Sequence, residues 1–333
     1  KPVTMADLHD VLSLVIKNDE AIAQLKPLIT SQNLQVVRQQ SHKGEILENA
    51  RVLLVEDNRI NQAVLLGILS NFKAGTEVAA NGLEALDKLN QSADDSMFEL
   101  VIMDCQMPEM DGYEATREIR RGSAGERYSL IPIIAMTANA MKGDKEKCLD
   151  AGMNDYMAKP VNADVFRDKL VHWLELKRGA QTSSKGILSM ESTALPEPKR
   201  YSEKIQAYRP AQINSEDDSL DIVSGSSIWL KEDFYERIQN NQPLADKLIA
   251  LYIEDTPQLI SLVAESVEKE DFVQVKAHAH KLKGASKNIG AESIALLSRH
   301  IEVLSDKEEK AALIDCIEQM RSQFDEFNCL IHS

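Results

Sequence analysis

Two residues of this sequence have the chemistry for exchanging a phosphoryl group. Asp104 ends the apolar run Leu100-Val-Ile-Met-Asp104, which has the composition of a buried strand. His280 lies in a predicted helix, within the run Ala277-His-Ala-His280. A carboxylate and a neutral imidazole can each attack phosphorus as a nucleophile. The pair predicts a phosphorelay in which Asp104 accepts a phosphoryl group and passes it to His280.

Other side chains that could handle phosphate follow the neighbouring predicted strands. They are Glu56, Asp57, Thr137 and Lys159. In a parallel α/β sheet, ligands gather at the carboxyl ends of the strands. Together with Asp104, the two acids would repel one another by roughly 4 kcal/mol per close pair at an effective dielectric constant near 20. A divalent cation removes this repulsion, and Mg²⁺, which prefers oxygen ligands, is the expected ion.

The same residues suggest how the chemistry would run. Mg²⁺ and the Lys159 ammonium would neutralise charge on the phosphoryl oxygens, and the Thr137 hydroxyl would donate a hydrogen bond to one of them. The alternative is that acids at strand ends cap helices or face solvent, the usual role of an isolated pair such as Glu56 and Asp57. Because five suitable side chains fall at four successive strand ends, we favour the phosphoryl-transfer site.

Residues 50–177 alternate between strand and helix patterns. Apolar runs predict strands at residues 51–57, 76–80, 98–103, 131–136 and 155–160. Helical spacing predicts helices at residues 60–69, 83–89, 113–121, 144–150 and 163–176. Five strands that alternate with five helices form a parallel sheet covered on both faces. The predicted fold class of this region is therefore doubly wound α/β.

The region after this α/β domain has a different character. Residues 178–225 are rich in Ser, Pro, Gly and charged residues, which predicts a flexible linker with an average span of roughly 35–40 Å. Residues 226–333 show only helical patterns, at residues 229–240, 244–269, 272–289, 293–304 and 311–330. Long amphipathic helices with short connections predict an all-α four-helix bundle.

Residues 1–49 contain a short repeat of the α/β domain. Lys1-Pro-Val precedes an amphipathic helix, as Lys159-Pro-Val does. The repeat predicts that this segment is the tail of another copy of the domain, followed by a polar connector. A chance Lys-Pro-Val before an ordinary helix is the alternative. Because residue 1 is not methionine, we expect the chain to be a piece of a longer protein.

The helix predicted at residues 272–289 sets the surroundings of His280. At 100° per residue, His280 lies roughly 130° from the centre of the apolar stripe, so it is expected to face solvent. Lys276, Lys283 and Lys287 fall near it on the helix surface. Their charges would attract an incoming phosphoryl group.

Two other residues of this helix have different interpretations. Gly284 costs a helix about 1 kcal/mol relative to alanine, a cost explained if the missing side chain leaves room for another protein's phosphorylated site. His278 falls nearer the apolar stripe and is predicted to be structural. A metal site made by His278 and His280 is not expected, because residues two positions apart on a helix do not face each other.

The amino-acid composition limits which binding partners and which cellular location are expected. The net charge of −15 argues against nucleic acid, which requires a basic surface. Four scattered cysteines without a CxxC pair indicate a reducing compartment. No apolar run approaches the roughly 20 residues of a membrane helix, and no secretory signal is visible. We therefore expect a cytoplasmic location without direct membrane contact by this chain.

Residues 50–177 resemble a response-regulator receiver domain over their whole length. The similarity rests on four motifs: Val55-Glu-Asp-Asn-Arg-Ile-Asn-Gln62, Met103-Asp-Cys-Gln-Met-Pro-Glu-Met-Asp-Gly112, Ile134-Ala-Met-Thr-Ala-Asn139 and Tyr156-Met-Ala-Lys-Pro160. Their style is that of receivers fused to hybrid sensor histidine kinases. The resemblance implies a flavodoxin-like fold.

The resemblance also implies roles for individual residues. Asp104 would be the phosphoacceptor. The implied Mg²⁺ ligands are Glu56, Asp57, Asp104 and the backbone carbonyl of Gln106. Thr137 and Tyr156 would form a switch pair that responds to phosphorylation, although Tyr156 has the alternative role of a half-buried aromatic residue in the last strand.

Residues 226–333 resemble a histidine phosphotransfer (HPt) domain. The similarity rests on the run His280-Lys-Leu-Lys-Gly284, on the helix count and on the position after a receiver. It implies that His280 is the phosphohistidine and that Lys283 is its electrostatic helper. Lys281 stands where small residues are frequent in this family, and it adds charge. No catalytic acid or base is expected, so the domain would relay phosphate and not make it from ATP.

Together the resemblances predict the C-terminal region of a bacterial hybrid sensor histidine kinase. Phosphate would pass from the kinase core of the parent protein to Asp104, then to His280, then to the receiver of a downstream response regulator. The parent would be an inner-membrane sensor, and autokinase activity would belong to it, since this chain lacks ATP-binding glycine motifs. The alternatives are a phosphate-gated binding module and a phosphate sink, in which the bundle regulates the receiver and relays nothing.

Overall fold

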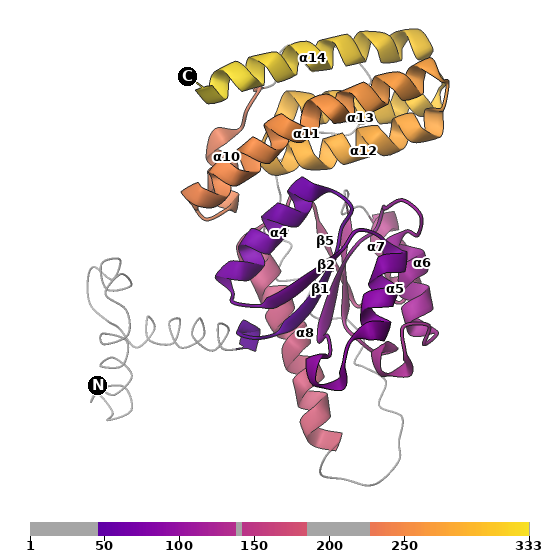
Figure 1. Cartoon of the computed structure of the whole chain (residues 1–333), viewed down its shortest axis with the longest axis vertical. Coiled ribbons are helices and arrows are strands. Elements are labelled where there is room, and N and C mark those ends of the chain that lie inside the picture. The colour runs from indigo at the N-terminus through magenta and orange to yellow at the C-terminus, as the bar shows by residue number, and fades with distance from the viewer. Residues whose placement is uncertain (1–45, 138–141, 185–226, 333) are drawn as a thin grey trace, which may run out of the picture.

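The computed structural model of the chain describes residues 46–137, 142–184 and 227–332. It shows an α/β domain with a bundle of long helices above it (Figure 1). The predictions for residues 1–45 and 185–226, which are most of the upstream segment and most of the linker, lie outside the described residues. The predicted order of domains, an α/β domain followed by an all-α domain, is confirmed.

The sheet of the α/β domain has five parallel strands. They are β1 (Arg51–Val55), β2 (Gly75–Ala79), β3 (Leu100–Asp104), β4 (Ile133–Thr137) and β5 (Asp155–Ala158). Their spatial order is β2-β1-β3-β4-β5, and every neighbouring pair is parallel. The order changes direction between β1 and β3, and ligands bind at such a point beyond the carboxyl ends of the strands. The predicted flavodoxin-like sheet is confirmed.

Helices cover both faces of this sheet. They are α4 (Arg59–Asn71), α5 (Gly82–Gln91), α6 (Gly112–Arg120), α7 (Lys142–Asp150) and α8 (Ala163–Ser184). Side chains alternate along β1: Val52 and Leu54 join the core beneath α4 and α8, whereas Leu53 and Val55 join the core beneath α5, α6 and α7. Burial on both faces explains why the strands are continuous apolar runs.

Helix α8 is longer than the sequence analysis predicts. The predicted helix ends at residue 176 and the predicted linker begins at residue 178, but α8 ends at Ser184. Lys177 Nζ donates to the backbone carbonyl of Glu99 (3.1 Å), and Arg178 pairs with the Glu99 carboxylate (2.8 Å). These contacts hold the last turns of α8 against the segment before β3, an interaction that the polar composition of the helix could not indicate.

The C-terminal domain has four long helices, preceded by a short one. They are α10 (Lys231–Arg237), α11 (Gln242–Glu268), α12 (Phe272–Ile289), α13 (Glu292–Asp306) and α14 (Lys310–His332). Helix α12 ends at Gly290, whose positive φ of 81° is a left-handed conformation that commonly terminates helices. The aromatic rings of Tyr252, Phe324 and Phe327 fill the interior. The predicted four-helix bundle is confirmed.

The two domains are in direct contact. Helix α4 of the α/β domain packs against α11 and α12 of the bundle (Figure 1). The buried apolar side chains of the bundle and those beneath α4 and α8 form one continuous cluster through this contact. Gly67 of α4 faces Leu244 of α11 so closely that an added Cβ would lie 2.5 Å from Leu244 Cδ2. Arg59 and Asp255 form an ion pair (2.9 Å) across the same boundary.

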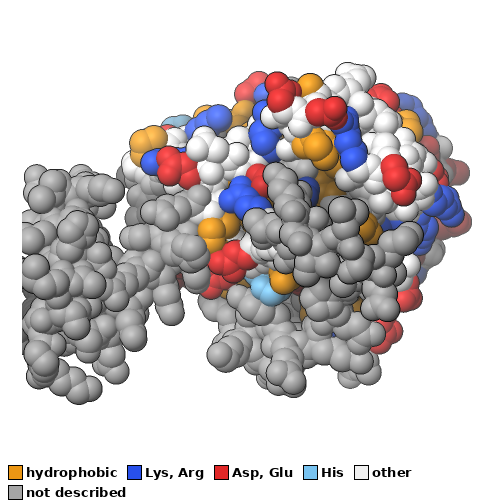
Figure 2. Space-filling view, turned by 90° about the horizontal axis from the view of Figure 1, so that it is seen from below, with side chains coloured by type: hydrophobic (Ala, Val, Ile, Leu, Met, Phe, Trp, Pro, Cys, Tyr) orange, Lys and Arg blue, Asp and Glu red, His pale blue; other side chains and the backbone are white. Residues whose placement is uncertain are grey.

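The surface away from the bundle carries charges of both signs. Figure 2, a view from below, shows Lys and Arg side chains next to Asp and Glu on the described part of this face. The net charge of the chain is therefore not gathered here into one acidic patch. Among the helices that the structure describes, none combines the length and the apolar content needed to cross a bilayer.

Candidate functional site

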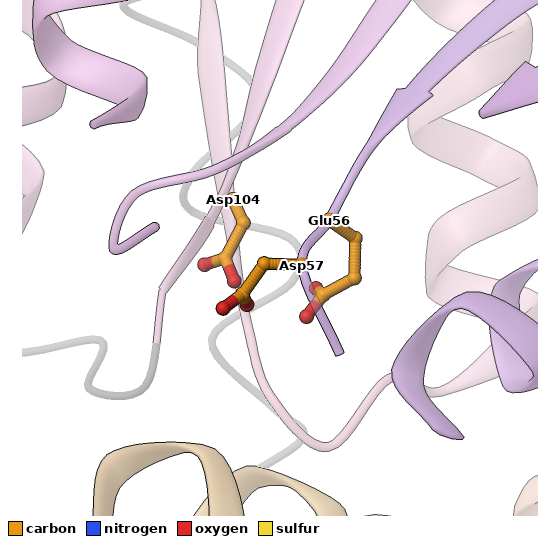
Figure 3. A group of neighbouring side chains, drawn as sticks. All are labelled: Glu56, Asp57 and Asp104. Atoms are coloured by element: carbon orange, nitrogen blue, oxygen red, sulfur yellow. The ribbon is translucent and has the colours of Figure 1, made fainter. Parts of the chain in front are cut away.

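Three carboxylates meet where β1 and β3 end. Glu56 and Asp57 follow β1 directly, and Asp104 is the last residue of β3. One oxygen atom of each lies within 4.8 Å of the others, and Figure 3 shows the three side chains directed into a common space that faces the bundle. Glu56 is 1% exposed and Asp104 is 4% exposed. The structure therefore brings together the acidic residues that the sequence analysis singled out.

The backbone around the cluster explains this convergence. Asn58 is the N-cap of α4, and its Oδ1 accepts hydrogen bonds from the N–H groups of Ile60 (2.9 Å) and Asn61 (3.2 Å). This cap begins the helix immediately after Asp57. On the other side, an added Cβ on Gly112 would lie 2.0 Å from the carbonyl oxygen of Asp104. Glycine is required there, since any side chain would displace the strand that carries Asp104.

Lys159 supplies positive charge inside the cluster. Its Nζ donates to Glu56 Oε2 and to Asp104 Oδ2, at 2.7 Å in both cases. Burial would lower the pKa of the Lys159 ammonium, but the charges of Asp104 and Glu56 outweigh burial and raise it. One ammonium does not balance two buried carboxylates. Burial and the charge of Asp104 consequently raise the pKa of Glu56 to about 8.

The donor set fits a hard divalent cation. The three carboxylates offer closely spaced oxygen ligands, which Mg²⁺ prefers. Burial and the charge of Asp104 raise the pKa of Glu56, and a divalent ion would favour the ionised carboxylate. Gln106, the fourth predicted ligand, lies beside the cluster, because its backbone N–H donates to Asp104 Oδ1 at 3.4 Å.

Thr137 and Tyr156 lie on adjacent strands of the sheet. Thr137 is the last residue of β4 and is 4% exposed. Tyr156 of β5 is partly buried, and its ring centroid lies 5.5 Å from Lys145 Nζ and 5.7 Å from Lys169 Nζ. The half-buried aromatic interpretation of Tyr156 fits this arrangement. The switching role of the pair stays a prediction.

His280 of α12 interacts with a carboxylate that the sequence analysis missed. Its Nδ1 lies 2.8 Å from Glu302 Oε1, and Lys283 Nζ donates to the same oxygen at 2.6 Å. Burial would raise the pKa of the Glu302 carboxyl, but the hydrogen bond from His280 and the charge of Lys283 lower it. An ionised Glu302 accepts a hydrogen bond from Nδ1–H, which leaves the Nε2 lone pair available for attack.

The surroundings of His280 differ from the prediction. Its side chain is 24% exposed, so the expectation that it faces open solvent is wrong. Bundle and α/β domain enclose a small cavity, lined by Glu56, Asp57, Asn58, Asn61, Asp104, Lys159, His280, Lys281, Lys283, Gly284 and Lys287. The amphipathic pattern of α12 identifies the outer face of the bundle but cannot show that the chain's own α/β domain covers it.

Two further side chains of α12 lie away from this cavity. Lys276, predicted to lie near His280, pairs with Asp306 of α13 (2.6 Å). His278 is partly buried, and its Nδ1 lies 3.3 Å from the hydroxyl of Ser266. This contact agrees with the structural role predicted for His278.

Asn61 connects the acidic cluster to the bundle. Its Nδ2 donates to Glu56 Oε1 (2.7 Å), and its Oδ1 accepts from Asn288 Nδ2 of α12 (2.6 Å). An added Cβ on Gly284 would lie 3.4 Å from Asn61 Nδ2. Gly284 therefore leaves room for a neighbour, as predicted, and here the neighbour belongs to the same chain. No sequence pattern indicated this role of Asn61.

Comparisons with known proteins match each of the two domains to a known domain family. Residues 52–171 match the response regulator receiver domain family, and residues 247–327 match the Hpt domain family. The sensor histidine kinase GacS of Pseudomonas protegens is 25% identical over 308 residues, which cover 90% of this chain and 30% of the relative. Hybrid signal transduction histidine kinase I of Dictyostelium discoideum is 39% identical over 137 residues, 40% of this chain and 8% of the relative.

A solved structure resembles the α/β domain. It is the receiver domain of the sensor histidine kinase PA1611 of Pseudomonas aeruginosa, described with a magnesium ion coordinated in its active-site cleft. The sequences are 41% identical, the match covers 38% of this chain and 98% of that one, and the TM-score is 0.34.

The chain spans less than a third of each of these curated relatives, and the two family matches account for both folded domains. It therefore combines a region similar to the response-regulator receiver domain with a region similar to the Hpt domain, an arrangement that supports a role in a two-component phosphorelay.

Proposed function

We propose that Asp104 accepts a phosphoryl group from a kinase histidine and passes it to His280, which donates it to a downstream response regulator. The observation that carries this proposal is the small cavity between the domains, which both residues line. A donor carboxylate and an acceptor imidazole that line one cavity support direct transfer, because positioning is a large part of catalysis in phosphoryl transfer.

The transfer needs no further acid or base. The Nε2 lone pair of His280 attacks phosphorus, an N–P bond forms, and the bond between phosphorus and the Asp104 carboxyl oxygen breaks. Asp104 leaves as a carboxylate, and Lys159, already 2.7 Å from its Oδ2, stabilises the returning charge. Glu302 holds the imidazole and balances the positive charge that develops on its ring.

Mg²⁺ would be held by Glu56, Asp57, Asp104 and the backbone carbonyl of Gln106. When bound, it supplies charge that stabilises the phosphoryl oxygens. Lys283 contributes positive charge from the bundle side of the cavity. Thr137 and Tyr156 form the proposed switch pair, in which the hydroxyl of Thr137 contacts the phosphoryl group and Tyr156 turns inward.

The proposed parent is a bacterial hybrid sensor histidine kinase in the inner membrane, with this region in the cytoplasm. Hybrid histidine kinases are among the matched relatives from both bacteria and eukaryotes, so the bacterial origin rests on the sequence motifs alone. The proposed phosphate donor is the kinase core of the parent, and the proposed acceptor is the receiver of a separate response regulator.

The test follows ³²P from a small acyl phosphate donor, acetyl phosphate, supplied with Mg²⁺ to the full chain. We expect alkali-stable label on His280 in the wild-type chain, label only on Asp104 in His280→Gln, and no label in Asp104→Asn. His278→Gln is the matched control and should behave like the wild type. Label that stays on Asp104 in the wild-type chain would favour the phosphate-gated binding module.

A second step separates relay from sink. After labelling, an excess of a separate receiver domain is added to the wild-type chain. Label that moves from His280 to the added receiver supports the relay. Label that is lost only as inorganic phosphate would favour the phosphate sink.

A further inference from the structure

Lys281 of the bundle reaches into the acidic site of the receiver. Its Nζ lies 2.7 Å from Asp57 Oδ2, and the two side chains are 31% and 7% exposed. Its backbone carbonyl accepts a hydrogen bond from Asn58 Nδ2 (3.1 Å). Lys281 is thus attached to the receiver at both its backbone and its ammonium, directly beside the residue that begins α4.

This contact adds to the positive charge around the acidic cluster. Lys159 contacts Glu56 and Asp104, but no ion pair between Lys159 and Asp57 occurs in the described residues. Lys281 contacts Asp57 from the opposite side, across the domain boundary. Each of the three carboxylates therefore has an ammonium partner, and the partner of Asp57 comes from the other domain.

We infer that the bundle places the ammonium of Lys281 against Asp57 as a counter-ion. Mg²⁺ binding and the ion pair between Lys281 and Asp57 therefore oppose each other. The inference rests on the proposed Mg²⁺ site. Two cations on one small carboxylate repel each other strongly in a buried setting. If Mg²⁺ weakens the seating of Lys281, then by linkage the seated lysine weakens Mg²⁺ binding by the same factor.

The consequence concerns which form of the receiver holds the bundle. In the metal-free receiver, Lys281 makes up part of the missing positive charge. With Mg²⁺ bound, the ion and Lys159 already balance the three carboxylates, so Lys281 becomes an excess positive charge and is repelled. Phosphorylation of Asp104 adds negative charge and removes the excess. Lys281 therefore makes the bundle disfavour the Mg²⁺-loaded receiver that has no phosphoryl group to transfer.

The test is a calorimetric titration of the full chain with MgCl₂ at constant ionic strength. Lys281→Met keeps most of the aliphatic stem and removes the charge, and we expect it to bind Mg²⁺ about fivefold or more tightly than the wild type, the lower range of typical coupling between sites. Lys281→Arg keeps the charge and should stay near the wild type. Lys276→Met, which removes a charge from the same helix outside the cavity, should change the affinity less than twofold.

The outcomes distinguish this inference from the function on which it rests. Equal Mg²⁺ affinity in Lys281→Met and the wild type would overturn the inference and leave the metal site intact. Weaker Mg²⁺ binding in Lys281→Met would also overturn the inference, since it would show that the lysine assists binding of the ion. Absence of Mg²⁺ binding in every variant would refute the metal site and the inference together.

Discussion

Glu302 orients the ring of His280, and in the proposed transfer it leaves Nε2 as the reacting nitrogen. Its carboxylate faces Nδ1 (2.8 Å) and is also paired with Lys283. In Glu302→Gln the amide can still accept a hydrogen bond but no longer balances the imidazolium charge, and it can also present its N–H₂ group to Nδ1. We expect transfer from Asp104 to His280 to slow by roughly 10–100-fold, the range that small misplacements of a reacting group produce. Rapid-quench measurement of label arriving on His280 checks this.

Glu292→Gln on the same helix is the control for Glu302→Gln. It also removes one carboxylate from α13, at the first turn and away from Nδ1 of His280. If both variants slowed transfer equally, the effect would come from the net charge of the bundle and not from the orientation of the ring.

Single residues differ in how well their roles could be predicted. Glu56, Asp57, Asp104 and Lys159 were predicted because the carboxyl ends of parallel strands converge whatever the loops between them do. Glu302 and Asn61 were missed because each acts through a partner on another helix. Which face of α13 meets His280, and which domain meets Asn61, depends on packing that periodicity does not specify.

At the scale of elements, α4 and α12 form the surface through which the domains meet, and Gly284 permits their close approach. Gln at position 284 has a far better helix propensity than Gly, by roughly 0.5 kcal/mol or more. Its side chain would meet Asn61, since even a Cβ would lie 3.4 Å from Asn61 Nδ2. We therefore expect Gly284→Gln to leave the thermal stability of the bundle unchanged or raised, while transfer to His280 slows about tenfold or more.

Val273→Gln provides the control for Gly284→Gln. Val273 is in the same helix and is 78% exposed, so a longer polar side chain there should leave transfer unaffected. Thermal unfolding by circular dichroism and the label assay are measured on the same samples. Slower transfer accompanied by an unfolded bundle would contradict the steric explanation.

Helices were predicted well where the residues that define their ends are close together in the sequence. Helix α12 has the predicted ends, because an apolar stripe runs from Phe272 to Ile289 and Gly290 terminates it. Helix α8 was predicted too short, because Lys177 and Arg178 are polar and their partner Glu99 lies far away in the sequence. Residues 178–184, predicted to open the linker, therefore belong to α8.

At the scale of the whole molecule, the new feature is that the two domains are docked with Asp104 and His280 on one cavity. The sequence analysis predicted transfer from Asp104 to His280 and a linker between their domains, but it did not predict how the two domains dock. Nothing in either domain's own pattern specifies the pairing. It depends on complementary contacts such as Asn61 with Asn288, Arg59 with Asp255 and Gly67 with Leu244.

This arrangement predicts that transfer occurs within one chain. Two domains joined in one chain meet at an effective concentration on the order of millimolar, so wild-type transfer from Asp104 to His280 should proceed at a rate independent of protein concentration. A mixture of Asp104→Asn and His280→Gln chains can transfer only between molecules, and at about 10 µM it should be roughly 100-fold slower, with a rate proportional to concentration. Rapid-quench label transfer at several concentrations measures both. If the mixture matched the wild type at low concentration, the docked arrangement would not be the one that transfers phosphate, and the cavity shared by Asp104 and His280 would have to form between two chains.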